Sequence, residues 1–420
     1  MSAKTNPYDV MVLGAGIVGV SSALELQSRG IATILVDQQS PGLGASFGNS
    51  GVIQREAVMP YAMPRDFKTL FTTLMGQNTA ARLHLTALPG LLPFFARYWW
   101  YSSQENHRKQ ATSYATLIER CVDAYEHQIS GTGAKQYLKP QGILAGFRDD
   151  KSFRAAKDEA EYAASHFGIK TSYLENETAI QQAIPHIKNI FSGMVRYHDS
   201  ITVSDPHALL TELFKKFKIL GGEFAKANAF ALARAGETYS LIGDSDLVTA
   251  KHAVIALGAH APELTRKFGL KIPMGIKRGY HVHFEQDPQA PLEATFADEK
   301  YGFVLTPKAE GIRLTTGAEF AGLLAAPTPK QLEQVIPIAQ KLHPLGARIE
   351  KTPWMGLRPC MPDMLPIISN MPGHDNLWCA FGHGHQGLTL GPITGVLIAD
   401  LVMGQQPSID LAPFAASRFS

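Results

Sequence analysis

The glycine-rich turn near the N-terminus constrains this chain more than any other feature. Residues 8–13 (YDVMVL) form a short apolar run typical of a buried parallel strand, and residues 17–29 follow with helical periodicity. A second apolar run, residues 32–36 (ATILV), completes a strand–helix–strand unit. The sequence therefore predicts an α/β fold that begins with a βαβ unit.

The turn itself has the spacing of a dinucleotide-binding motif. Gly14 permits the tight turn, Gly16 lets a pyrophosphate approach the backbone, and Gly19 allows close packing of helix on strand. Asp37 ends the second strand, where its carboxylate can accept hydrogen bonds from a ribose. The turn alone does not distinguish FAD from NAD. The residues predicted to contact the dinucleotide here are Gly14, Ala15, Gly16, Ile17, Val18, Gly19, Asp37 and Gln38.

Two further glycine-rich segments suit close approach to a flat ligand. Residues 42–51 (GLGASFGNSG) directly follow the acidic strand end, and residues 382–387 (GHGHQG) open the last predicted helix, 388–403. A helix N-terminus aimed at a reduced flavin would stabilise the negative charge that develops on it. His383 and His385 stand in a glycine turn with no cysteine or carboxylate at ligand spacing, so no metal site is predicted.

Length and composition indicate a two-domain globular protein. The chain has 420 residues, of which 45% are hydrophobic and 18% charged, so it is too long for one compact core and too apolar to be disordered. The net charge of +2 is spread along the chain, which argues against nucleic-acid binding. Three widely spaced cysteines, with no CxxC, favour a reducing compartment.

No stretch approaches the roughly 20 apolar residues of a membrane-spanning helix. The first strand follows the N-terminus at once and leaves no room for a signal peptide, so a cytoplasmic location is expected. Residues 85–101 (LTALPGLLPFFARYWWY) favour a partly buried helix; the alternative is an aromatic surface resting on a membrane, peripheral on its inner face.

The middle of the chain alternates helical segments with short antiparallel strands. We therefore expect a discontinuous nucleotide-binding domain, residues 1–58, 199–272 and 352–420. An α+β domain with an antiparallel sheet, residues 59–198 and 273–351, would bind the substrate.

Taken together, these segments resemble FAD-dependent D-amino-acid dehydrogenases and their relatives glycine oxidase and sarcosine oxidase, within the D-amino-acid oxidase superfamily. The resemblance is carried by VMVLGAGIVGVSSALELQSRG, VDQQSPGLGASFGNSGVI, VIALGAHAPEL, WMGLRPCMPDMLPII and FGHGHQGLTLGPITGVLIADL. It implies a Rossmann-like, glutathione-reductase-like FAD-binding domain and a separate substrate domain. FAD rather than NAD is then the expected cofactor.

The resemblance also implies roles for particular residues. Arg358, in GLRP, would bind the substrate carboxylate, a role that suits its bidentate guanidinium. Tyr301, His385 and Gln54 are further candidates for polar groups at the reacting centre. The remaining residues expected against FAD are Gly44, Ala45, Ser46, Asn49, Ser50, Gly51, Val52, Gly258, Gly384, His385, Gln386, Gly387 and Leu388.

One departure concerns the attachment of the flavin. Relatives that bind it covalently use a cysteine seven residues before the aspartate of the Pro-Asp pair, and Gly356 stands at that position here. Cys360 has a different spacing. Non-covalent FAD is therefore expected.

The resemblance implies oxidative deamination of a D-amino acid to a 2-oxo acid and ammonia, by hydride transfer from Cα to flavin N5. The electrons would pass to a quinone or another acceptor that is not oxygen. Three alternatives stay open at this point: oxidation of sarcosine, glycine or D-hydroxyproline; an NAD-dependent dehydrogenase; and a flavin-holding subunit whose catalytic partner lies elsewhere.

Overall fold

The predicted N-terminal strand–helix–strand unit forms and lies at the centre of an eight-stranded sheet. The computed structural model describes residues 8–74, 76, 78–188, 190–243 and 247–419. In this sheet a parallel core in the order β10-β2-β1-β13-β21 carries antiparallel strands at its edges. Its strands are β1 (Tyr8–Leu13), β2 (Thr33–Asp37), β10 (Glu223–Lys226), β11 (Ala233–Ala235), β12 (Thr238–Ile242), β13 (Leu247–Ile255), β20 (Ile367–Asn370) and β21 (Leu377–Phe381).

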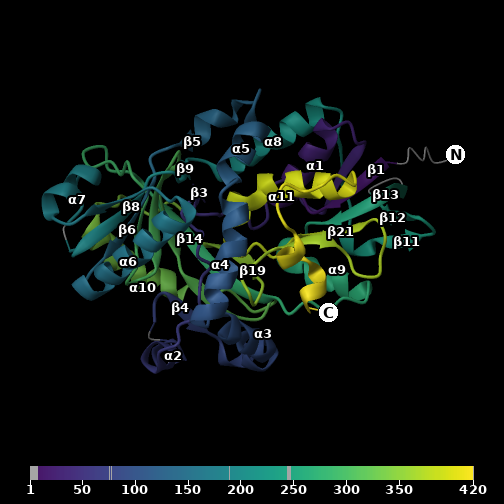
Figure 1. Cartoon of the computed structure of the whole chain (residues 1–420). Helices are drawn as coiled ribbons and strands as arrows, with labels where there is room; N and C mark the ends of the chain where they lie inside the picture. The colour runs from purple at the N-terminus through teal and green to yellow at the C-terminus, as the bar shows by residue number, and fades with distance from the viewer. Residues whose placement is uncertain (1–7, 75, 77, 189, 244–246, 420) are drawn as a thin grey trace.

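Two helices far apart in sequence cover one face of this sheet, side by side (Figure 1): α1 (Ile17–Ser28) and α11 (Gly387–Val402). Glycines on α11 allow backbone contact between them. A Cβ on Gly391 would lie 2.9 Å from a side-chain carbon of Ile17, and one on Gly395 would lie 2.6 Å from the carbonyl oxygen of Ser21. The two helices can therefore pack closely only because these positions lack a side chain.

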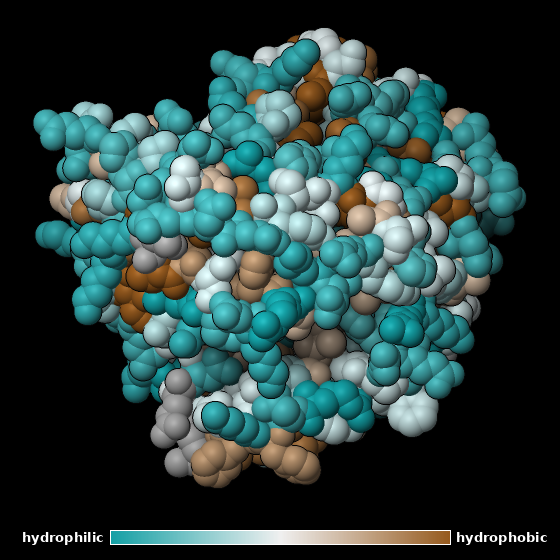
Figure 2. All heavy atoms as spheres, turned by 60° about the vertical axis from the view of Figure 1, so that its left-hand side comes forward, coloured by the Kyte–Doolittle hydropathy of each residue, from teal (hydrophilic) through white to brown (hydrophobic). Residues whose placement is uncertain are grey.

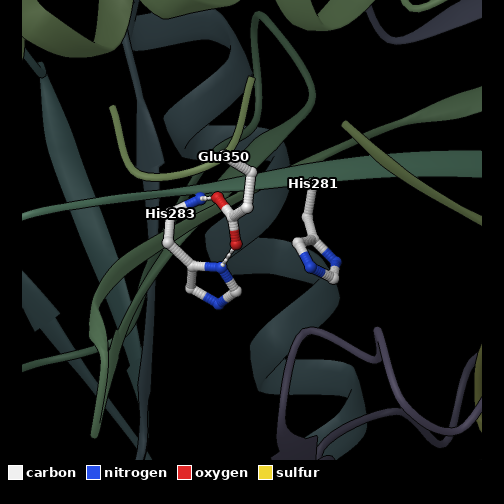
Figure 3. Close-up of side chains that lie close together, drawn as sticks. All are labelled: His281, His283 and Glu350. Carbon is white, nitrogen blue, oxygen red and sulfur yellow. Dashed lines mark hydrogen bonds and ion pairs between the residues drawn. The ribbon is translucent and has the colours of Figure 1, made fainter. Parts of the chain in front are cut away.

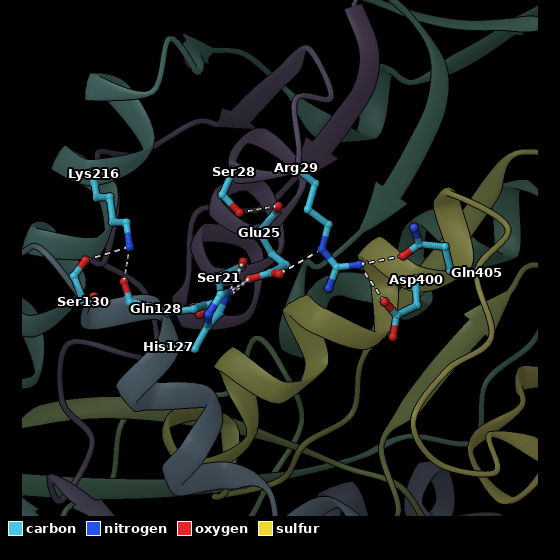
Figure 4. A network of polar contacts seen from close by, with 10 residues as sticks. All are labelled: Ser21, Glu25, Ser28, Arg29, His127, Gln128, Ser130, Lys216, Asp400 and Gln405. Atoms are coloured by element: carbon cyan, nitrogen blue, oxygen red, sulfur yellow. Dashed lines mark hydrogen bonds and ion pairs between the residues drawn. The ribbon is translucent and has the colours of Figure 1, made fainter.

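A polar network fixes the far ends of the same helices (Figure 4). Glu25 of α1 is 3% exposed and accepts a hydrogen bond from Arg29, which also pairs with Asp400 of α11 at 2.6 Å. His127 and Gln128, from α5 (Cys121–Ile129), approach the other oxygen of Glu25. Because Glu25 is buried, these contacts compensate its desolvation and hold α1, α5 and α11 in one arrangement.

The second sheet has ten strands and is mostly antiparallel, as the sequence predicts. Its order is β4-β18-β14-β17-β16-β15-β6-β8-β7. β19 pairs with the other edge of β14. The strands are β4 (Ala81–Leu83), β6 (Ile143–Phe147), β7 (Thr171–Leu174), β8 (Gly193–Tyr197), β14 (Gly275–Phe284), β15 (Phe296–Asp298), β16 (Phe303–Lys308), β17 (Gly311–Thr316), β18 (Ala318–Phe320) and β19 (Trp354–Cys360).

A small third sheet, β3 (Val52–Ile53), β9 (Ile201–Val203) and β5 (Leu138–Lys139), connects the two lobes seen in Figure 1. The domain limits expected from the sequence stay a proposal, and three elements pack with the other domain. β19 belongs to the second sheet, whereas α4 (Gln104–Ile118) and α5 contribute to the same hydrophobic core as α1 and α11. The other helices are α6 (Asp150–Phe167), α7 (Glu177–Ala183), α8 (Pro206–Ile219), α9 (Ala261–Lys267) and α10 (Lys330–Leu342).

Two helices at the bottom of Figure 1 expose apolar side chains, α2 (Phe67–Leu74) and α3 (Leu88–Tyr101). On α2, Phe67 is 89% exposed and Phe71 63%; Trp100 on α3 is 68% exposed. Figure 2 shows apolar side chains gathered at the lower edge of the molecule, the height at which α2 lies in Figure 1. Among the described residues no helix is both long and apolar enough to cross a membrane.

The second sheet contains a fully buried ion pair. Arg278 of β14 and Glu319 of β18 both have unexposed side chains, and their closest atoms are 2.7 Å apart. Glu319 also accepts hydrogen bonds from Tyr280 and Thr328, and these contacts lower its pKa although burial alone would raise it. Both oxygens of the buried Glu319 carboxylate are thus engaged. The stability of the ion pair therefore depends on both Arg278 and Glu319.

We expect Arg278→Met to lower the free energy of unfolding by about 3–5 kcal/mol, because it removes the permanently charged partner of the buried Glu319 carboxylate and leaves the His84 imidazole, 2.7 Å away, beside it. The matched control is Lys170→Met, which removes the exposed pair with Asp199 and should cost at most about 1 kcal/mol. Chemical denaturation of the two variants measures the difference. Equal, small losses would contradict the importance of the buried pair.

Candidate active site

One large cavity, of about 1940 Å³, is shared by the two lobes. On the side of the first sheet its wall consists of the β1–α1 turn, the end of β2, the loop of residues 42–51 and the start of α11. On the other side it consists of residues from β14, β16, β17 and β19. All three glycine-rich segments singled out in the sequence therefore meet at one cavity.

The N-terminus of α1 faces this cavity and requires its glycines. A Cβ on Gly14, where φ is +105°, would lie 2.5 Å from the carbonyl oxygen of Ala256, and one on Gly19 would lie 1.7 Å from that of Gly14. The N-cap residue of α1 is Gly16, which has no side chain to cap the helix. Instead, the N–H of Ile17 donates to Ser46 Oγ at 2.9 Å. This end of α1 thus offers oriented N–H groups to an anion.

Asp37 lies where the motif predicts, at the end of β2 and in the cavity wall. One carboxylate oxygen accepts the N–H of Ala15 at 2.7 Å, and the other accepts that of Gln39 at 2.9 Å. These bonds fix the carboxylate beside the glycine turn. Each oxygen retains a lone pair, so a ribose hydroxyl can still donate to it.

The loop of residues 42–51 is held from the second lobe by buried cationic and imidazole groups. The guanidinium of Arg313 donates to the carbonyl of Asn49 at 2.6 Å, and His281 Nδ1 lies 3.2 Å from the carbonyl of Gly48. Lys308 fills the space where Gly51 has no side chain. Burial lowers the pKa of Arg313 to about 10, which leaves it charged at neutral pH. The loop is therefore a positioned wall of the cavity.

His281, His283 and Glu350 lie close together behind this loop (Figure 3), with potential ligand atoms within 4.8 Å of one another. Glu350 accepts from the backbone N–H of His283 at 2.7 Å and from its Nδ1. The other ring nitrogen, Nε2, accepts from Arg313 Nε at 2.8 Å. Both nitrogens of the His283 ring are thus engaged, so Glu350, His283 and Arg313 form a hydrogen-bonded chain that orients Arg313.

The segment before α11 lies beside the loop, since the Asn49 side-chain amide donates to the carbonyl of His385 at 3.5 Å. The N–H of Gly384 donates to the carbonyl of Pro359 at 2.8 Å, and the ring of His385 meets that of Tyr61 edge-on at 4.5 Å. Gln386 donates to Gln54 at 2.7 Å, which joins two predicted segments. Burial lowers the pKa of His385 to about 3, so its imidazole is neutral at physiological pH.

Arg358, on β19, extends over Gly279 of β14, where a Cβ would lie 2.2 Å from its Nη2. Its guanidinium donates to the carbonyl of Gly317 at 2.5 Å and to that of Thr316 at 3.1 Å. Within the described part of the chain, Arg358 has no carboxylate within salt-bridge distance. A half-buried guanidinium with neutral partners, at the wall of a large cavity, is suited to bind an anion.

The structure places most of the predicted residues in the cavity wall, with four exceptions. Gly19 and Gly51 pack against the chain instead, and Gln386 lies behind the wall. Tyr301 does not line the cavity: its ring lies 4.6 Å from the Arg148 guanidinium, which Asp298 holds by two hydrogen bonds. The residues found in the wall are Gly14, Ala15, Gly16, Ile17, Val18, Asp37, Gln38, Gly44, Ala45, Ser46, Asn49, Ser50, Val52, Gln54, Gly258, Arg358, Gly384, His385, Gly387 and Leu388.

Among the wall residues that the sequence analysis did not single out are Tyr61, Lys277, Glu299 and Trp354. Tyr61 is 59% exposed, and its ring meets that of His385. The neighbouring carboxyl groups of Asp298 and Glu159 contribute to a raised pKa of Glu299. Only Lys277 had a usable signal, because period-two alternation along residues 275–284 places it on the same face as Gly279.

The fit of the glycine turn to a dinucleotide can be tested at Gly19. A Cβ there would displace the carbonyl of Gly14, so Gly19→Ala should yield protein with little or no bound flavin. Gly90→Ala on α3, where the added Cβ meets no atom within 4 Å, is the control and should retain it. The flavin-to-protein absorbance ratio of purified protein measures both. Full flavin content in Gly19→Ala would contradict the assignment.

Comparison with known proteins agrees with this geometry. Among curated proteins, the chain is 30% identical to a D-amino-acid oxidase of Bradyrhizobium diazoefficiens, over 98% of each chain. It is 29% identical to a D-amino acid dehydrogenase of Methylobacterium radiotolerans, over 98% of this chain and 99% of that one.

Two solved structures share the fold. One is glycine oxidase from Geobacillus kaustophilus, with a TM-score of 0.74 and 20% identity over 99% of each chain. The other is L-proline dehydrogenase from P. horikoshii, with a TM-score of 0.75 and 18% identity over 99% of this chain and 98% of that one. The profile of the family described as FAD dependent oxidoreductase (DAO) matches residues 9–401. Since that match spans nearly the whole length, this chain belongs to the FAD dependent oxidoreductase family.

Proposed function

We propose that this enzyme oxidises a D-amino acid at Cα to a 2-oxo acid and ammonia, and passes the electrons to a quinone rather than to oxygen. The single observation that carries the proposal is Arg358. It is a half-buried cation in the wall of the cavity formed by the FAD-binding segments, and among the described residues its hydrogen-bond partners are two backbone carbonyls. An α-carboxylate would supply the missing counter-charge.

The carbonyls of Thr316 and Gly317 hold two nitrogens of the guanidinium, so its plane is fixed before a substrate arrives. A fixed guanidinium defines the direction of a bound carboxylate, and therefore the position of the adjacent Cα. Arg358 thus acts as the group that orients the substrate.

Bound FAD supplies the acceptor for the hydride. The substrate amine must be neutral, so that its lone pair forms the C=N bond as hydrogen leaves Cα with two electrons; water then hydrolyses the imine to the 2-oxo acid and ammonia. Near the carboxylate the chain provides neutral His385, whose uncharged ring does not repel a cationic ammonium on entry. The side chains therefore bind and orient, and none is needed as a nucleophile.

The D-configuration is supported by the curated relatives, one named D-amino-acid oxidase and one D-amino acid dehydrogenase. With the carboxylate fixed at Arg358 and the hydrogen directed toward the flavin, the amine and the side chain take the two remaining directions, and a pocket for the side chain selects between the enantiomers. The opposite configuration would then either turn the hydrogen away from the flavin or push the side chain into the protein.

The quinone is supported by the apolar mouth of the cavity. Phe67, Phe71 and Leu74 of α2 line the cavity and are also exposed, as is Leu92 of α3. An exposed apolar surface continuous with a cofactor cavity suits a hydrophobic electron acceptor and contact with a membrane surface.

Replacing Arg358 by Leu should leave FAD bound and lower kcat/KM for a D-amino acid by at least ~100-fold, roughly 2.7 kcal/mol. The reason is the loss of both the charge-assisted contact and the orientation of Cα. Arg348→Leu removes an arginine that pairs with the exposed Glu333 and is the control. Steady-state kinetics with an artificial dye measures both, and activity of Arg358→Leu within a few-fold of wild type would show that Arg358 is only structural.

The double variant Phe67→Ser/Phe71→Ser should slow reoxidation of reduced flavin by a soluble quinone, while flavin reduction by substrate stays unchanged. Ile242→Ser changes an equally exposed apolar residue on β12 and should affect neither step. Stopped-flow absorbance separates the two half-reactions. Rapid reoxidation of wild type by oxygen, with stoichiometric peroxide, would contradict the proposed acceptor.

A further inference from the structure

The substrate cavity contains a second cation beside Arg358. Lys277 of β14 is the direct cross-strand partner of Arg358 of β19, and both residues line the cavity. Two like charges directly opposite each other on one face of a sheet destabilise it. A fold that retains such a pair at the wall of a substrate site points to an anionic ligand that compensates both charges.

Arg278, the neighbouring cation on the same strand, differs from Lys277 in having a carboxylate partner. Arg278 points to the opposite face and pairs with the buried Glu319. Lys277 has no such carboxylate: across the described residues its polar contact is the Tyr98 hydroxyl, 3.3 Å from Nζ. Its ammonium lies 4.7 Å from the centre of the Tyr98 ring and 5.5 Å from that of Phe320. Aromatic faces stabilise a cation without neutralising it.

Lys277 and Arg358 are neighbours across two paired strands, but their charged groups extend toward different residues. The Arg358 guanidinium lies over Gly279 and reaches the carbonyls at the end of β17. The Lys277 ammonium turns toward Tyr98 of α3 and Phe320 of β18. One carboxylate at Arg358 therefore leaves Lys277 free to bind a second anionic group of the same molecule.

Acidic residues limit where that second group can lie. Glu56, Glu159 and Glu299 also line the cavity. The charges of Glu299 and Arg358 both act on the Tyr61 hydroxyl. An anionic side chain directed toward these glutamates would be repelled. The end of the cavity at Lys277, with its aromatic walls, is thus the place for it.

We propose that the substrate is a dicarboxylic D-amino acid of the glutamate or aspartate type, whose side-chain carboxylate is bound by Lys277. This inference rests on the proposed function, because it assigns the α-carboxylate to Arg358. It makes Lys277 a specificity-determining residue that distinguishes an anionic side chain from a neutral one of the same shape.

The test compares D-glutamate with D-glutamine on the holoenzyme, since the two differ in charge but hardly in shape. Wild type should prefer D-glutamate by at least ~10-fold in kcat/KM. Lys277→Met, which keeps the length of the side chain, should lower kcat/KM for D-glutamate by ~100-fold, mainly through KM, and leave D-glutamine within a few-fold. Lys277→Arg should restore most of the preference, and the exposed Lys170→Met should change nothing.

Two outcomes would overturn the inference. A wild-type kcat/KM for D-glutamine equal to or above that for D-glutamate shows that Lys277 binds no side-chain carboxylate. An equal loss for D-glutamate and D-glutamine in Lys277→Met shows that it shares the α-carboxylate with Arg358 or acts only on the fold. Failure of the proposed function looks different: no D-amino acid is then turned over by any variant, and Arg358→Leu has no effect.

Discussion

The backbone contact between α1 and α11 is the constraint on which the site depends. Gly391 and Gly395 let the last helix lie directly against the first, and the Glu25–Arg29–Asp400 network fixes their far ends. Their N-termini therefore open onto one cavity although about 370 residues separate them. A side chain at either glycine would push the two helices apart and separate the two ends of the cofactor site.

The same strand of the second sheet carries both a structural and a functional cation. Arg278 and Lys277 are adjacent, but the alternation of a strand sends them to opposite faces. Arg278 meets a buried carboxylate and stabilises the sheet, whereas Lys277 joins Arg358 at the cavity. A charge held away from full hydration without a carboxylate partner is costly, so its retention at a cavity is better explained by binding than by stability.

Sequence patterns predicted the segments of the site whose geometry is determined by neighbouring residues in the chain. The glycine turn, Asp37 and the start of α11 follow from strand and helix signals, and their neighbours in the chain determine their geometry. Tyr301 is absent from the cavity wall because its ring packs on the guanidinium of Arg148, which is distant in sequence. Tyr61 gave no signal, since only the packing of α11 brings His385 against it. Side chains that meet across two lobes depend on long-range topology, which periodicity does not encode.

The central claim is that one cavity holds FAD beside a carboxylate-binding arginine, in an arrangement that accepts D-amino acids. The most direct measurement is an anaerobic titration of the purified holoenzyme, with flavin absorbance as the readout and the two enantiomers of one amino acid as titrants. The account predicts that the D-enantiomer bleaches the flavin completely at one equivalent and that the L-enantiomer leaves it oxidised. Bleaching by the L-enantiomer, or none by either across acidic and neutral amino acids, would contradict it.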